Sequence, residues 1–431
     1  MSRSRYKPPF HRRIIPWVFA IVFVVLAPSL LFYTAGYRLN PNKRVIERNG
    51  TLILDTTPGN ARIFLNGQEH PDKTAATLQN VTPGTYQVRF ERQGYYPWEK
   101  RLEVKAEQVT FANKIYLWRQ LEPKLLAETT AALLSRAQKK QRFIITENAG
   151  SSSTVQSLLV FDNDTLSRRI NLPASTTVSA IEWSTSDDAI VASTEGDGYW
   201  VDIRSTNTQN NLPPGTYRWH DDIVTGLNPE RRYSFDPRSK QLSSIVTASG
   251  TDELGPASLM NATGTTEQLL SWNNDLNRAF SLPRGQWQIH SIQGDFILLE
   301  DGLRLLAVKN KSSNAQESYG VIQSWLPDAE IPTALIINQN ELWLWQIDQN
   351  PELLIRNSEA FVRADWHPQA GTVFYATKTK VLALELDNRD GRQRTELATF
   401  ENIQDLATVN DRLIILGTKD GKTVVWSLGL E

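Results

Sequence analysis

The longest apolar run of the chain lies near its N-terminus, at residues 14–36, and contains no charged residue. As a helix rising about 1.5 Å per residue, this run spans roughly 35 Å, enough to cross a hydrocarbon core of about 30 Å. Its aromatic residues near the two ends suit the membrane–water interfaces. The pattern therefore predicts one transmembrane helix, with these side chains contributing to the anchor: Trp17, Phe19, Phe23, Pro28, Phe32 and Tyr33.

A cleaved signal peptide is the alternative interpretation of this run. Its apolar region usually has about 7–15 residues and ends in small residues. Here the run is longer, and the bulky residues 30–33 occupy the stretch where a cleavage motif would lie. We therefore favour an uncleaved anchor.

The charges that flank the run bear on its orientation. Residues 1–13 contain basic residues and no acidic residue, and further basic residues follow the helix, so the bias is small. Because basic residues are enriched on the cytoplasmic side, we expect a basic cytoplasmic tail at residues 1–13 and an extracytoplasmic C-terminal region. The basic residues of the tail are Arg3, Arg5, Lys7, Arg12 and Arg13.

Alternating apolar and polar positions follow the helix, with dense turn chemistry between them. Tyr86, Val88 and Phe90 alternate with polar residues, which is typical of a half-buried strand. Asn66-Gly67 is typical of a tight hairpin turn, because both residues tolerate a positive φ. The pattern predicts a small β-domain at residues 49–118.

This stretch resembles the PEGA domain family. The matching segments are Pro58-Gly59-Asn60-Ala61 at the name-giving motif, then Ile63 to Gly67, Pro83-Gly84-Thr85-Tyr86 and Gly94-Tyr95. Asn60 stands where the family has its acidic residue. The resemblance implies a small β-sandwich that serves as an extracytoplasmic spacer or binding module, and it transfers no catalytic residue.

The remaining region, residues 123–431, consists of short β-runs without a long amphipathic helix. A Trp recurs through it at gaps of 36, 68, 38 and 41 residues, the gap of 68 being about twice the others, as if one repeat lacked its Trp. A period of roughly 35–42 residues with about four strands per unit is typical of a β-propeller. The predicted repeat residues are Trp183, Trp219, Trp287, Trp325 and Trp366.

The predicted fold class is therefore mainly β: a transmembrane helix, a PEGA-like β-sandwich and a β-propeller of about seven blades, within a range of six to eight. Glu182-Trp183-Ser184 and Asp365-Trp366-His367-Pro368 loosely resemble irregular propellers of the WD40, Kelch or TolB kind. We expect the last strand, at residues 424–426, to share a blade with residues near 124–135. A string of two or three β-sandwiches is the alternative.

The composition of the chain excludes several kinds of chemical site. The chain has 46 basic and 47 acidic residues, so no global field favours nucleic acid. The absence of Cys excludes disulfides, zinc–thiolate sites and thiol nucleophiles, and only five His are present. We expect no catalytic, metal or cofactor-binding residue and no cofactor.

Three polar motifs are candidate exceptions. Trp219-His220-Asp221-Asp222 has the residue types of a metal or acid–base site, but it lies where a repeat begins and a structural role is favoured. Asp162-Asn163-Asp164 and Glu195-Gly196-Asp197-Gly198 lack the full ligand alternation of a calcium loop and fit ordinary turns.

These features together predict a non-enzymatic, membrane-tethered binding or scaffold protein of the cell envelope. Its expected partners are membrane lipid, through the one helix, and an envelope protein or glycan. The alternative is a hydrolase of envelope polymers that uses acidic residues in the propeller centre. A sensor is disfavoured, because the 13 residues before the helix are too few for a signalling domain.

Overall fold

The structure is a computed structural model. It describes the whole chain except residues 1–9, 35–36, 41–44, 129–130, 138, 140, 148–154, 175–176, 195–196, 206–208, 221, 228–230, 247–251, 255–256, 262–267, 274–278, 311–314, 327–328, 368–370 and 431. The chain divides into two compact units. The first comprises Met1–Gln120 with Asp387–Gln393, and the second comprises Leu121–Leu386 with Arg394–Glu431.

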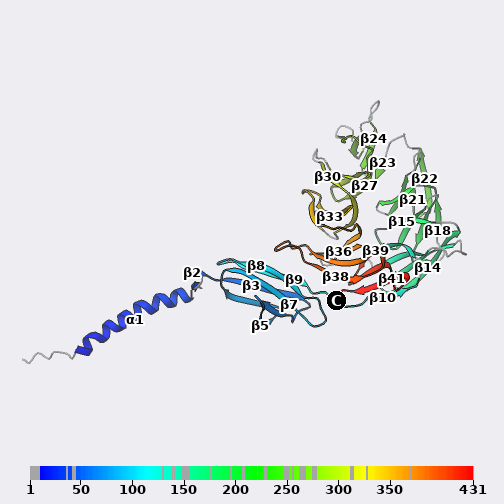
Figure 1. The fold of residues 1–431 in the computed structure, drawn as a ribbon. Coiled ribbons are helices and arrows are strands. Elements are labelled where there is room, and N and C mark those ends of the chain that lie inside the picture. Colours follow the sequence, from blue (N-terminus) through cyan, green and yellow to red (C-terminus); the bar gives the residue numbers. More distant parts are fainter. Residues whose placement is uncertain are drawn as a thin grey trace, which may run out of the picture. The chain divides into compact units, whose positions relative to one another are not determined.

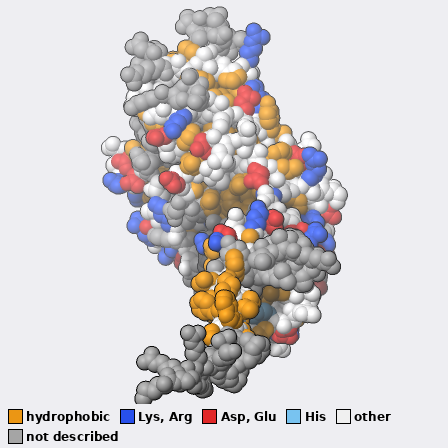
Figure 2. Space-filling model, turned by 90° about the vertical axis from the view of Figure 1, so that its left-hand side faces the viewer, with side chains coloured by type: hydrophobic (Ala, Val, Ile, Leu, Met, Phe, Trp, Pro, Cys, Tyr) orange, Lys and Arg blue, Asp and Glu red, His pale blue; other side chains and the backbone are white. Residues whose placement is uncertain are grey.

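The N-terminal helix α1 spans Phe10–Thr34 (Figure 1). Within it, the segment Ile15–Phe32 has a mean hydropathy of 2.5, and none of that segment is buried by the rest of the chain. Figure 2 shows its apolar side chains as one continuous hydrophobic surface. The helix is long and apolar enough to cross a membrane, which agrees with the run predicted at residues 14–36.

The helix is followed by a two-stranded ribbon, β1 (Tyr37–Asn40) and β2 (Val45–Arg48), and then by a sandwich of two sheets. One sheet has the order β6-β3-β9 and the other has the order β5-β4-β7-β8. The strands are β3 (Gly50–Thr57), β4 (Arg62–Leu65), β5 (Gln68–Lys73), β6 (Ala76–Val81), β7 (Gly84–Glu91), β8 (Trp98–Val104) and β9 (Val109–Tyr116).

The core of the sandwich is formed by strands in which buried and exposed residues alternate. In β8 every second residue is buried, beginning with Trp98, whose ring stacks on Phe90 with 5.1 Å between centroids. The predicted turns form where φ must be positive: Asn66 has a φ of 50° and Gly67 of 80°. Asn60 has a φ of 63°, a conformation that Asn tolerates well, so the departure from the family motif is accommodated.

The outer edge of β8 is covered by the segment Asp387–Gln393, which belongs to the same compact unit. The backbone N–H of Arg101 donates to the Asp390 carboxylate at 2.8 Å, and that of Glu99 donates to the Gln393 side chain at 3.1 Å. Because an open strand edge invites pairing with another chain, these side chains protect the edge.

The second unit contains eight four-stranded antiparallel sheets in its described part, one more than the central estimate and within the expected range. We number these sheets as blades 1–8 in chain order. Blades 1–4 are formed by β11 (Ala131–Arg136), β12 (Arg142–Glu147), β13 (Val155–Asp162) and β14 (Thr165–Ala174); β15 (Val178–Trp183), β16 (Ala189–Thr194), β17 (Gly198–Asp202) and β18 (Gln209–Leu212); β19 (Thr216–His220), β20 (Ile223–Leu227), β21 (Arg231–Asp236) and β22 (Gln241–Val246); and β23 (Asp252–Leu254), β24 (Ala257–Asn261), β25 (Gln268–Trp272) and β26 (Phe280–Ser281).

The other four blades continue the pattern. Blades 5–8 are formed by β27 (Gln288–Gln293), β28 (Phe296–Asp301), β29 (Arg304–Lys309) and β30 (Ala315–Tyr319); β31 (Val321–Trp325), β32 (Thr333–Asn338), β33 (Glu341–Gln346) and β34 (Glu352–Arg356); β35 (Phe361–Trp366), β36 (Thr372–Thr377), β37 (Lys380–Glu385) and β38 (Arg394–Thr399); and β39 (Asn402–Val409), β40 (Arg412–Lys419), β41 (Lys422–Gly429) and β10 (Lys124–Ala127).

Blade 8 joins the two ends of the second unit (Figure 1). Its outer strand β10 pairs with β41, with Lys124 opposite Ser427 and Leu125 opposite Trp426. This is the strand sharing expected from the sequence between residues 424–426 and residues near 124–135. Apolar clusters then fill the spaces between successive blades, for example Phe143 and Leu416 between blades 1 and 8.

The repeat Trp residues occupy related but unequal positions. Trp183, Trp325 and Trp366 end the first strand of their blades, Trp219 lies one residue before that end, and Trp287 precedes the first strand of blade 5. Blade 4, whose first strand has three residues, falls in the long gap between Trp219 and Trp287.

Three of these indoles donate Nε1–H to the first strand of the preceding blade, each time at its penultimate residue. Trp183 donates to Ser135 Oγ at 2.9 Å, Trp219 to the Glu182 carbonyl at 3.2 Å and Trp366 to the Ser324 carbonyl at 3.3 Å. Trp287 instead donates to the Pro283 carbonyl in its own loop. The periodic Trp therefore links neighbouring blades.

Replacement of Trp366 tests this link. Trp366→Phe keeps an aromatic ring and loses the bond to Ser324, so we expect a loss of about 1 kcal/mol in the free energy of unfolding beyond that caused by the smaller ring. The matched control is Trp345→Phe, at a fully buried Trp whose Nε1 has no partner among the described residues. Calorimetry of the full-length chain in detergent measures both, and an equal or larger loss in Trp345→Phe contradicts the link.

Candidate functional site

Four titratable side chains converge from three blades of the propeller. Glu182, Arg218 and His290 lie on first strands, β15, β19 and β27, and Glu300 lies on β28. The His290 Nδ1–H donates to Glu300 Oε2 at 3.0 Å, and Arg218 forms an ion pair with Glu300 Oε1 at 4.0 Å. We call these four residues the axial cluster; they come from blades 2, 3 and 5, so the Arg218–Glu300 pair joins two blades that are not consecutive.

The two carboxyl groups of the axial cluster have opposite electrostatic environments. Burial by surrounding protein raises the pKa of Glu182, and the charges of Arg218 and His290 oppose that rise. The hydrogen bond from His290 lowers the pKa of Glu300, against the effect of burial. The Glu182 side chain is nevertheless open to solvent. A carboxyl that is both accessible and surrounded by protein is typical of a group lining a recess.

The axial cluster combines both signs of charge and can donate and accept hydrogen bonds. It suits recognition of a polar group, such as a side chain of a bound protein. Two carboxyls with separated pKa values are also the starting point for acid–base chemistry. Among the residues that the structure describes, no group of three or more Asp, Glu or His side chains could hold a metal ion.

A second set of charges, on the first strands of blades 7, 8 and 1, has a structural role. The buried Asp365 accepts hydrogen bonds from Arg136 and from the Thr408 backbone, both at 2.8 Å. Arg363 pairs with Asp405 at 3.6 Å, and burial raises the pKa of Asp405 while Arg363 opposes the rise. These groups pair with one another and link blades 7, 8 and 1.

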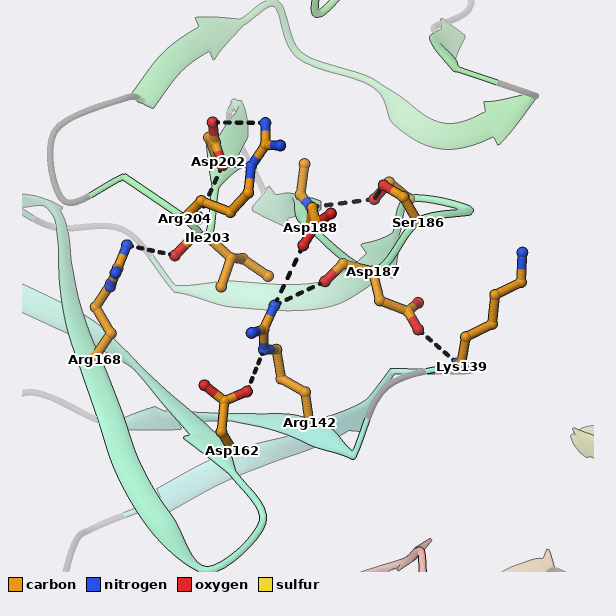
Figure 3. A network of polar contacts seen from close by, with 12 residues as sticks. Lys139, Arg142, Asp162, Arg168, Ser186, Asp187, Asp188, Asp202, Ile203 and Arg204 are labelled. Atoms are coloured by element: carbon orange, nitrogen blue, oxygen red, sulfur yellow. Dashed lines mark hydrogen bonds and ion pairs between the residues drawn. The ribbon is translucent and has the colours of Figure 1, made fainter.

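Figure 3 shows a polar network between blades 1 and 2. Arg142 donates to Asp162 at 2.6 Å and to the Asp187 carbonyl at 3.1 Å, and it lies 3.7 Å from Asp188. Arg168 donates to the Ile203 carbonyl at 2.7 Å. One guanidinium thus joins a hairpin of blade 1 to the turn between β15 and β16.

The contacts of Asp162 also bear on the first of the two calcium-loop motifs, Asp162-Asn163-Asp164. Asp162 is bound by Arg142, Asp164 forms an ion pair with Arg412, and Asn163 has a φ of 54° in the turn between β13 and β14. The motif is therefore a hairpin turn whose carboxylates pair with arginines. In the second motif, Glu195 and Gly196 lie outside the described residues.

The remaining predicted residues are dispersed. In the Trp219-His220-Asp221-Asp222 motif, Asp221 lies outside the described residues, and the exposed Asp222 pairs with Arg238. Trp17, Phe19, Phe23 and Phe32 are exposed on α1. Pro28 lies within the helix, as does Tyr33, whose side chain is not among those described.

Sequence reasoning missed the axial cluster, although a signal was present. Glu182, Arg218 and Asp365 each stand immediately before a repeat Trp. Side chains alternate along a strand, so the residue before an interblade Trp points to the other face of its strand. His290 and Glu300 carry no comparable signal.

Comparisons with known proteins agree with this fold. Residues 49–115 match the sequence model of the PEGA domain. No curated protein matches the chain. The C-terminal WD40 domain of Sif2 is similar in structure, with 13% identity, a TM-score of 0.51, and coverage of 71% of this chain and 98% of that chain.

Two further solved structures have lower scores. The Myceliophteria thermophila Cps50 (Swd1) β-propeller domain has 9% identity, covers 71% of this chain and 100% of its own, and has a TM-score of 0.44. Dihydro-heme d1 dehydrogenase NirN in complex with DHE has 11% identity, covers 65% and 69% respectively, and has a TM-score of 0.47. The likeness to the Sif2 domain shows a WD40-type propeller fold.

Protonation of His367 gives a test of packing in blade 7. Burial lowers the pKa of His367 to about 4, below the ordinary value of about 6.5 for histidine. Between these values the unfolded chain binds a proton that the folded chain does not, so the free energy of unfolding falls as pH decreases, by about 3 kcal/mol in total. The pKa values of Glu182 and Asp405 are raised, so these two carboxyl groups make the free energy of unfolding increase as the pH decreases.

The variant His367→Gln isolates this contribution. We expect its free energy of unfolding to depend less on pH between 6.5 and 4 than that of the wild type, as measured by urea unfolding across the range. His70→Gln, which changes a histidine of the sandwich, is the control and should follow the wild type. Parallel pH profiles for wild type and His367→Gln contradict the assignment.

Proposed function

We propose that this chain is a membrane-tethered, non-catalytic scaffold of the cell envelope, whose propeller presents a surface for protein or glycan binding. The observation that carries the proposal is the combination of an exposed apolar helix with an eight-bladed WD40-type propeller in one chain. WD40 propellers are typically scaffolds for protein interactions, which supports the non-catalytic role.

The tether places the rest of the chain next to a membrane. Nothing else in the described chain covers Ile15–Phe32, and burial of so much apolar surface requires a bilayer or a partner. The basic tail at residues 1–13 favours a cytoplasmic N-terminus and an extracytoplasmic propeller. The PEGA domain then serves as a spacer between the helix and the propeller.

An exposed apolar group on the propeller supports protein binding. Leu303, Tyr319 and Val321 are each about half exposed, at 51%, 52% and 53%. They lie together where blade 5 connects to blade 6, because the Gly320 N–H donates to the Leu303 carbonyl at 2.8 Å. Loops held by a rigid scaffold are the usual place for recognition.

A hydrolase is the second candidate, favoured by one observation. Glu182 and Glu300 have pKa values shifted in opposite directions, which is the arrangement that lets one carboxyl act as an acid while the other stays ionised. This candidate predicts cleavage of a glycan that Glu182→Gln abolishes.

Photocrosslinking in living cells tests the scaffold. A photoreactive benzoylphenylalanine replacing Tyr319 should give discrete protein adducts, and the same residue replacing Leu242, which is 44% exposed on β22, should not. Leu303→Asp should remove the adducts, because it places a charge in the apolar contact. Absence of adducts at position 319, or adducts that persist in Leu303→Asp, contradicts protein binding through this group.

A further inference from the structure

A cavity of about 780 Å³ lies between blades 5 and 6, distinct from the axial cluster. Its walls include Phe296 and Ala307 of blade 5 and Trp325 and Ile347 of blade 6, which belong to the apolar cluster between these blades. Sites for small ligands usually have volumes of about 300–1,000 Å³. The cavity therefore has the size of a ligand site.

One residue that lines the cavity has a polar atom without a partner. Gln316 Oε1 belongs to a lining residue, is buried, and has no hydrogen-bond partner among the described residues. Of the 13 buried side-chain atoms in this condition, six belong to blades 5 and 6 or the loops that follow their strands: Ser291 Oγ, Asn310 Oδ1, Gln316 Oε1, Gln323 Oε1, Ser324 Oγ and Trp345 Nε1. Of these six residues, Gln316 alone lines the cavity. Because an unsatisfied buried polar group is costly, its amide points to a polar group bound there.

Two aromatic rings complete the site. Phe296 and Trp325 are half-buried and line the cavity, one from each blade. Lys309 Nζ lies 5.6 Å from the centre of the Phe296 ring. An aromatic ring that offers an apolar face beside the Gln316 amide matches a ligand with both C–H faces and hydroxyl groups.

The charge of the rim restricts that ligand further. Asp295, Glu330 and Asp348 are exposed at the cavity, against the single cation Lys309. An excess of carboxylates repels an anionic ligand. The ligand that fits is hydroxyl-rich, has an apolar face and carries no negative charge.

We propose that this cavity binds a neutral saccharide, with Phe296 and Trp325 stacking on sugar rings and the side-chain amide of Gln316 forming a hydrogen bond with a sugar hydroxyl group. The inference rests on the glycan-binding part of the proposed function and gives it a place and a ligand class.

Calorimetric titration of the full-length chain in detergent tests the proposal with chitotetraose and maltotetraose as neutral probes and tetragalacturonate as the anionic probe. We expect at least one neutral probe to bind and tetragalacturonate not to bind. Gln316→Leu should weaken the binding about fivefold through loss of one hydrogen bond. Phe296→Leu, which keeps an apolar side chain and loses the ring, should weaken it by a similar factor.

The matched control is Gln323→Leu. Gln323 Oε1 is also buried without a partner, but Gln323 does not line the cavity, so its replacement should leave the affinity unchanged. Circular dichroism confirms that each variant is folded. The proposal is overturned if neither neutral probe binds, if only the anionic probe binds, or if Gln316→Leu and Phe296→Leu bind like the wild type.

The outcomes also separate this inference from the scaffold. If no saccharide binds but the photocrosslinked adducts at position 319 still form, the saccharide site is wrong and the scaffold proposal stands. Mass spectrometry of the titrated oligosaccharides supplies the remaining distinction, because shortened products would support the hydrolase and would contradict a site that only binds.

Discussion

Closure of the propeller depends on the pairing of β10 with β41, and the other features of the second unit follow from it. The two strands come from opposite ends of the unit, and each would otherwise leave an open sheet edge. Their pairing in blade 8 fixes β39, whose residues then meet blades 7 and 1 through Asp365, Thr408 and Asp405. Such long-range pairing is slow to form because a large loop must close first.

The blades are held together by three kinds of contact with different consequences. Apolar clusters supply most of the burial, the indole N–H bonds fix the offset between adjacent first strands, and the guanidinium of Arg142 joins turns at the periphery. With these contacts in place, the residues of the axial cluster and the walls of the cavity between blades 5 and 6 both lie mainly on paired strands. Rigid walls reduce the ordering cost of binding, which suits a protein that presents sites.

The sequence predicted the fold further than the sites, for reasons visible in particular residues. The charge-free run at residues 14–36, the Asn66-Gly67 turn and the Trp spacing each depend on local patterns, and local patterns predicted the helix, the PEGA domain and a propeller. The Trp spacing did not determine the blade count, because the first strands of blades 1, 4 and 8 contain no Trp. The axial cluster brings Glu182 to residues more than a hundred positions away, and no local pattern encodes that convergence. Gln316 could not be predicted from the sequence for another reason: whether an amide oxygen is unpaired depends only on its surroundings in the fold.

Cysteine labelling in intact cells tests most directly the proposal that the tethered propeller lies on the extracytoplasmic side of the membrane. The chain contains no Cys, so single substitutions give an unambiguous signal. We expect Gln349→Cys, at an exposed position of blade 6, to react with a membrane-impermeant maleimide in intact cells, and Ser4→Cys, in the basic tail, to react only after lysis. Labelling of Ser4→Cys in intact cells with protection of Gln349→Cys would place the propeller in the cytoplasm and contradict the account.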